Sequence, residues 1–102
     1  MNAVSKDEHD MTIINALLLN IADNCVTLTG NANVGDTVRY LEDGIENTIT
    51  AREHIPEWHK MAVCPVRNGG DVLKYGAVIG KAVRDIDIGD HVHVHNIRSP
   101  GL

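Results

Sequence analysis

The chain has 102 residues, a length that fits one domain and buries roughly 60 to 68% of the surface that the unfolded chain exposes. It contains no Phe, one Trp and two Tyr, so the core must consist of Val, Ile, Leu and Ala, which argues against a deep aromatic ligand pocket. The formal net charge is −5 and no dense Lys/Arg patch occurs, which argues against a nucleic-acid partner.

The N-terminal residues 1–10 are polar and charged without hydrophobic periodicity. They predict a loose tail, followed by one domain over residues 11–102. The longest mostly apolar run, from Ile13 to Ile21, includes two asparagines and is too short to span a bilayer. The first residues also lack the apolar segment of a signal peptide. We therefore expect a cytoplasmic protein with no membrane partner.

From Thr12 onward, short segments rich in Val, Ile, Leu and Thr are separated by turn signals that contain Gly, Asp and Asn. This pattern predicts an all-β fold of many short strands. The predicted strands are Met11–Asn20, Cys25–Thr29, Thr37–Leu41, Glu46–Ala51, Lys60–Val66, Val72–Lys74 and His91–His95. A helical turn is predicted over Ala77–Val83, where Gly76 and Gly80 weaken any longer helix.

An internal echo favours a two-part fold. Residues 35–40 resemble residues 70–75 at an offset of 35, and Gly89-Asp90 begins the same pattern again. In each copy a Gly permits the turn backbone, an Asp caps the turn with its carboxylate, and an alternating strand follows. We interpret the echo as pseudo-symmetry, with chance similarity as the alternative.

Three histidines near the C-terminus stand two residues apart: His91, His93 and His95, with Val92 and Val94 between them. A strand would place the imidazoles on one face and the valines on the other, so we predict both valines in the core. Neighbouring residues on one face lie about 6.5 to 7 Å apart and can share a metal ion, whereas His91 and His95 are too far apart in a strand. At most two of these histidines should therefore serve one metal centre. The alternative is an exposed polar edge strand.

A second cluster runs from His54 to Lys60. Pro56 prevents a regular strand or helix interior there, so His59 and Lys60 are predicted to emerge from a fixed loop. The histidine can act as a base near neutral pH, and the lysine can hold the carboxylate of an acid substrate. The alternative is a surface loop whose polar groups are merely solvated.

A third fragment is Lys74-Tyr75-Gly76. Its alternative interpretation is that Tyr75 packs and Lys74 is solvated. The sequence has no nucleophile elbow, phosphate loop, dinucleotide fingerprint or pair of catalytic carboxylates. The chain therefore carries fragments of a site rather than a complete one.

Read in order, these fragments belong to a longer pattern. The pattern is Ile55-Pro56-x-x-His59-Lys60-x-Ala62, then Gly70-x-x-x-Lys74-Tyr75-Gly76-x-x-Ile79-Gly80-x-Ala82, then Asp85-Ile86-x-x-Gly89-x-His91-Val92-His93-x-His95-Asn96. It resembles the N-terminal SAF domain of the altronate and galactarate dehydratase family over about residues 14–98. The His-Val-His-x-His-Asn ending is more similar to the altronate dehydratase and sulfolactate sulfo-lyase branches. Trp58 departs from the family, which usually has a small residue, often Gly, before His-Lys.

The resemblance implies a β-clip fold, as in SAF and type III antifreeze-like domains. It also implies the small subunit of a two-component carbon–oxygen hydro-lyase, which completes the active site of a large catalytic subunit on a small hydroxy acid such as altronate. One alternative is the small subunit of sulfolactate sulfo-lyase, a carbon–sulfur lyase. Two further alternatives are a non-catalytic ligand-binding or assembly module and a metal-binding protein that uses the histidines.

The resemblance also implies roles for individual residues. The expected catalytic residues are His59, Lys60 and Lys74; the expected substrate-binding residues are Tyr75, Gly76, His95 and Asn96; and the expected metal ligands are His93 and His95. The implied cofactor is a divalent metal, iron(II), held mainly by the large subunit. The chain alone is expected to be inactive without that partner, and a homo-oligomer remains open.

Overall fold

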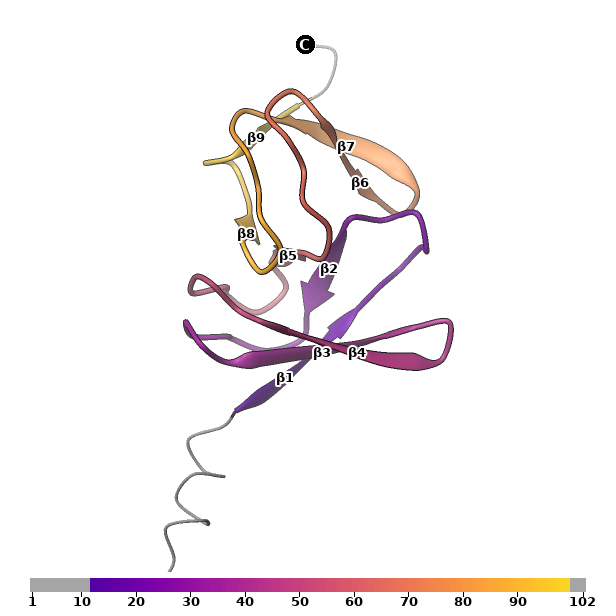
Figure 1. Ribbon diagram of the computed structural model, residues 1–102, viewed down its shortest axis with the longest axis vertical. Helices are drawn as coiled ribbons and strands as arrows, with labels where there is room; N and C mark the ends of the chain where they lie inside the picture. Colours follow the sequence, from indigo (N-terminus) through magenta and orange to yellow (C-terminus); the bar gives the residue numbers. More distant parts are fainter. Residues whose placement is uncertain (1–11, 100–102) are drawn as a thin grey trace, which may run out of the picture.

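The computed structural model describes residues 12–99. In this part of the chain there are nine short strands and no helix (Figure 1), so the all-β prediction is confirmed. The predicted tail over residues 1–10 lies outside the described residues.

The strands form two sheets. Their bounds are β1 (Ile13–Leu17), β2 (Cys25–Leu28), β3 (Thr37–Glu42), β4 (Ile45–Thr50), β5 (Lys60–Ala62), β6 (Asp71–Lys74), β7 (Ala77–Ala82), β8 (His91–Val92) and β9 (Ile97–Arg98). The larger sheet has the order β4-β3-β1-β2-β5-β8, and the smaller has the order β6-β7-β9. β1 pairs parallel with β3, and the other pairs are antiparallel. In Figure 1, β5 and β8 lie between the β1–β3–β4 layer and the smaller sheet.

The helical turn predicted over Ala77–Val83 is wrong, because this segment is strand β7. It forms a hairpin with β6, and both turn residues, Tyr75 and Gly76, have positive φ angles of 57° and 73°. Two positive φ angles favour a hairpin whose twist matches that of its strands. Gly80 also has a packing reason, since a Cβ there would lie 2.8 Å from the backbone oxygen of Arg98 on β9.

The strand predicted over His91–His95 is also wrong beyond its second residue. β8 ends at Val92, and a turn follows before β9 begins at Ile97. Val92 is 1% exposed, as predicted, but Val94 is 79% exposed, so its predicted place in the core is wrong. The physical reason is Asn96, whose side chain accepts from the amide of His93 at 3.0 Å and donates to the carbonyl of His91 at 2.7 Å, closing the turn.

The core has two parts. The first contains residues from β1, β2 and β3, including Leu28 and Val38, and the second packs around Ile86 and Val92. Isolated bridges join Ala32 to Ile55 in the first half and Val66 to Ile86 in the second.

Each of these four bridge residues precedes a strand by five residues, so one turn pattern recurs through the chain. Two of the predicted carboxylate caps are confirmed: Asp36 accepts from the amide of Asn33, and Asp90 accepts from the amide of Asp87, each at 2.8 Å. The third is wrong, because the carboxylate of Asp71 instead contacts Lys81 at 2.6 Å. The repeated pattern agrees with the predicted pseudo-symmetry.

Candidate functional site

Pairing of β5 with β8 brings two distant histidines together. Met61 is the register partner of His91, and His59 lies two residues before Met61 in the turn that leads into β5. The Nδ1 atom of His59 lies 2.9 Å from the Nε2 atom of His91. One nitrogen must donate the proton and the other must accept it, so the contact couples the tautomers of the two rings.

The turn after β8 folds the other two histidines back toward this pair. The ring centroid of His93 lies 4.7 Å from that of His59 and 5.3 Å from that of His91, to which it is nearly parallel. The ring of His95 lies 5.3 Å from that of His91. We call His59, His91, His93 and His95 the imidazole cluster. Its compactness depends on the turn, because an extended strand would have separated His91 from His95.

Two imidazoles of the cluster have lowered pKa values. Burial, together with the neighbouring histidines, lowers the pKa of His91 from 6.5 to about 4. Burial, followed by the charges of His59, Lys60 and His95, also lowers the pKa of His93. A neutral imidazole keeps a lone pair that can accept a proton or bind a metal ion.

Two overlapping groups in the described chain bring three metal-ligating atoms within 4.8 Å of one another. One group is His59, His91 and His93, and the other is Glu53, His91 and His95. Imidazole and carboxylate ligands suit divalent transition metals, so these donors fit the iron(II) that the resemblance implies. The two residues predicted as ligands, His93 and His95, fall into different groups. Sequence reasoning missed Glu53, because no sequence pattern marks this residue and only the fold brings it to the histidines.

Two predicted residues adjoin the cluster. Lys60, half-buried on β5, is close enough for its charge to lower the pKa of His93. Asn96 is 3% exposed, and its side chain bonds the backbone of His91 and His93. Asn96 therefore holds the backbone of these two histidines in position within this chain.

The fragment Lys74-Tyr75-Gly76 lies in the β6–β7 hairpin of the smaller sheet. The ammonium nitrogen of Lys74 lies 4.0 Å from the centre of the Tyr75 ring. The amides of Tyr75 and Gly76 donate to the two carboxylate oxygens of buried Asp23, at 2.9 and 2.7 Å. These contacts hold the hairpin turn and do not join it to the imidazole cluster. Sequence reasoning treated Asp23 only as part of a turn signal.

Trp58 has a structural peculiarity. Its φ angle is 69°, in the left-handed region, and its side chain is 62% exposed. Glycine adopts this conformation without the steric cost that a side chain brings. This geometry gives a physical reason why a glycine would fit this position more easily than a tryptophan.

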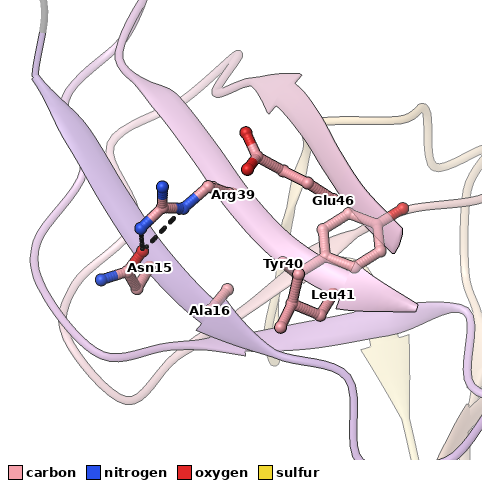
Figure 2. Close-up of a pocket in the computed structure, with 6 residues that line it drawn as sticks. All are labelled: Asn15, Ala16, Arg39, Tyr40, Leu41 and Glu46. Atoms are coloured by element: carbon pink, nitrogen blue, oxygen red, sulfur yellow. Dashed lines mark hydrogen bonds between the residues drawn. The ribbon is translucent and has the colours of Figure 1, made fainter. Parts of the chain in front are cut away.

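The surface hollows lie elsewhere. The larger has a volume of about 370 Å³ and is lined by Asn15, Ala16, Arg39, Tyr40, Leu41 and Glu46. Figure 2 shows the Arg39 guanidinium directed at Asn15, to whose side-chain oxygen it donates at 2.9 and 3.2 Å. A second hollow, of about 300 Å³, adjoins β4. Neither contains a histidine. The histidines of the imidazole cluster are half-buried or exposed.

Together, the fold and the cluster define a small β domain that presents imidazoles and a lysine on its surface. Residues 14–100 match the altronate/galactarate dehydratase SAF domain, and the chain belongs to this family. The predicted family and fold class are thereby confirmed. The chain is a lyase-related SAF domain.

Curated relatives agree with this assignment. Over 67 residues the chain is 39% identical to altronate dehydratase of Escherichia coli, a match that covers 65% of this chain and 14% of that enzyme. It is 40% identical over 57 residues to (2R)-sulfolactate sulfo-lyase subunit alpha of Paracoccus pantotrophus, covering 56% of this chain and 85% of that subunit. A third relative, galactarate dehydratase (L-threo-forming) of E. coli, is 34% identical over 69% of this chain and 12% of that enzyme. The chain thus spans only a small part of the dehydratases.

Among the described residues, no helix is long and apolar enough to cross a membrane.

Proposed function

We propose that this chain is the small subunit of a two-component lyase and completes the active site of a large catalytic subunit. The imidazole cluster beside Lys60 is the observation that carries the proposal, because it brings proton-accepting and cationic groups together on half-buried or exposed side chains. The lyase names of the curated relatives support the reaction class. The proposed substrate is a hydroxy acid, with altronate as the first candidate and water as the leaving group.

The chemistry of such an elimination matches the groups that the chain presents. A base must remove the proton α to the carboxylate, and a cation must stabilise the negative charge that develops there. In this proposal, a ring nitrogen of His59 accepts that proton while the contact with His91 orients the ring. The ammonium group of Lys60 holds the substrate carboxylate.

Further residues have proposed binding roles. His95, in the exposed turn after β8, contacts the substrate, and Asn96 keeps that turn in place. The hairpin residues Lys74, Tyr75 and Gly76 contact Asp23 or one another in this chain. They contribute to binding only if the large subunit brings the substrate to the hairpin.

The proposed cofactor is iron(II), held mainly by the large subunit. When bound, a divalent metal ion acts as a Lewis acid toward the substrate oxygens. The residues of this chain orient the substrate and accept its proton.

A second candidate reaction is the removal of sulfite from sulfolactate. One observation favours it: the match covers 85% of the sulfolactate sulfo-lyase subunit of P. pantotrophus but 14% of the altronate dehydratase of E. coli. That relative is named as a subunit, and most of its length aligns with this chain. The two candidates differ in the leaving group and share the proton abstraction.

The test is reconstitution with the proposed large catalytic subunit. The purified small chain should show negligible turnover of altronate or sulfolactate, and mixing the two chains should restore turnover of one of them. The product, a dehydrated acid or free sulfite, identifies the reaction. Full activity of the small chain alone would contradict the proposal, as would a large chain whose activity is unchanged by the small one. The latter result would favour the non-catalytic module.

A further inference from the structure

The imidazole cluster contains a set of nitrogens spaced for a shared ion. A divalent metal bound to imidazoles has metal–nitrogen distances of about 2.0–2.1 Å, so ligand nitrogens at a tetrahedral angle lie about 3.3–3.4 Å apart. The His59 Nδ1 and His91 Nε2 atoms are 2.9 Å apart, and a nitrogen of His93 lies within 4.8 Å of both residues' ligand atoms. Small rotations of the side chains would bring all three into range.

The backbone around these ligands is held by the fold. His59 enters β5 from a turn in which its own amide donates to Pro56 and its carbonyl accepts from Leu28. His91 lies in β8, paired with β5, and Asn96 bonds the backbone on either side of Val92. A ligand set prearranged in this way loses little conformational entropy when an ion binds.

The second group, Glu53, His91 and His95, competes for the same ring. A neutral imidazole carries one proton and offers one nitrogen to a metal, so His91 serves one group at a time. The three-histidine group offers three imidazole nitrogens, whereas the other group includes a carboxylate, a ligand that also suits Mg²⁺ and Ca²⁺. For a transition-metal ion the donor set therefore favours His59, His91 and His93.

We propose that this chain itself binds one divalent transition-metal ion through His59, His91 and His93, with the fourth position open to water or to an oxygen ligand. Three imidazoles select borderline ions such as Zn²⁺, Co²⁺ or Fe²⁺ over Mg²⁺ and Ca²⁺, which prefer oxygen ligands. The inference concerns the free chain and does not depend on the proposed lyase function, in which His59 is not metal-bound but accepts the substrate proton, and the large subunit mainly holds the metal.

The experiment is a titration of the full chain, with any purification tag removed and bound metal stripped, using Zn²⁺ in calorimetry and Co²⁺ in absorption spectroscopy. We expect saturable binding of one ion per chain, no competition from excess Mg²⁺, and a Co²⁺ spectrum typical of four-coordination. His59→Ala and His93→Ala should each weaken binding beyond the roughly 10- to 100-fold typical of residues that only orient a ligand.

Two matched variants make the test specific. His54→Ala removes an imidazole that belongs to neither group, and Glu53→Gln removes the carboxylate of the competing group. Both should keep the affinity within about threefold, far below the loss of a ligand. Circular dichroism checks that each variant is folded. The ligand positions are exposed or half-buried, so the His59→Ala and His93→Ala variants test the proposal even if His91→Ala does not fold.

Three outcomes would overturn the proposal. These are the absence of one-to-one Zn²⁺ binding, an equal loss in His54→Ala and His59→Ala, and a loss in Glu53→Gln with His59→Ala unaffected. The last outcome would move the ion to the second group.

Discussion

Trp58 carries its side chain on a backbone that favours glycine. Its left-handed φ of 69° costs a non-glycine residue about 1–2 kcal/mol. A glycine avoids this cost but lowers the free energy of unfolding by about 0.5–1 kcal/mol, because it loses more conformational entropy on folding. Trp58→Gly should therefore stabilise the chain by about 0.5–1 kcal/mol in urea unfolding.

Trp58→Ala is the matched control for this prediction. It also removes the exposed indole but keeps a Cβ in the left-handed region, so it should give no such gain. Equal unfolding free energies for the Gly and Ala variants would contradict the predicted gain and would mean that the strain at residue 58 is no larger than the entropy cost of glycine.

His91 links stability to pH. Burial and the neighbouring imidazoles lower its pKa to about 4 in the folded chain, whereas the unfolded value is about 6.5. Below pH 6.5 the unfolded chain binds the proton more readily, so stability present above that pH is lost progressively as the pH falls toward 4. Urea unfolding of the metal-free chain should show this loss.

His91→Gln isolates that contribution, because it removes the titrating group and keeps a side chain that forms hydrogen bonds. The variant should lose less stability than the native chain between pH 7 and pH 4. Parallel pH profiles for the two proteins would mean that other groups cause the acid destabilisation.

At the scale of elements, strand β8 ends between two valines that look equivalent in the sequence, so their environments differ. Val92 is buried in the second core and Val94 is exposed in the following turn. Val92→Asp should cost more than about 4 kcal/mol, because it buries an unpaired carboxylate. Val94→Asp should change stability by less than about 0.5 kcal/mol. Denaturant unfolding of both variants measures the difference, and similar losses in the two would contradict the turn after β8.

The β6–β7 hairpin shows how local and distant signals combine. Sequence reasoning favoured a helical turn over Ala77–Val83, whereas the segment Ala77–Ala82 is a strand. The strand forms because Asp23, far away in the sequence, holds the amides of the turn at Tyr75 and Gly76. Tertiary hydrogen bonds of this kind override a weak local preference.

For the whole molecule, the proposed lyase function predicts a large effect from one surface residue. In the reconstituted enzyme, His59→Ala should lower turnover by about 100-fold or more, the scale typical of general acid–base groups. The matched variant His54→Ala should retain most of the activity. Steady-state kinetics of the mixed chains provide the measurement, and circular dichroism confirms folding. A loss below about threefold for His59→Ala would contradict a role as base and favour the alternative that His59 is a solvated loop residue.

The sequence by itself determined the all-β class, the approximate positions of most strands and the residues of the family pattern. The reason is local: β-branched residues, alternation and Gly/Asp turns act within a few positions of the chain. It also singled out the histidines of the imidazole cluster, although it gave no role to His91. The positions of these histidines relative to one another were beyond its reach.

Only the tertiary structure decided which groups meet. The pairing of β5 with β8 brings His59 to His91, and the Asn96 turn brings His93 and His95 back to them. Glu53 enters by the same folding. Some of these contacts join residues that are distant in sequence, and the others depend on a turn that one buried side chain closes with its hydrogen bonds. The period-2 pattern of the valines predicts neither the distant contacts nor the turn.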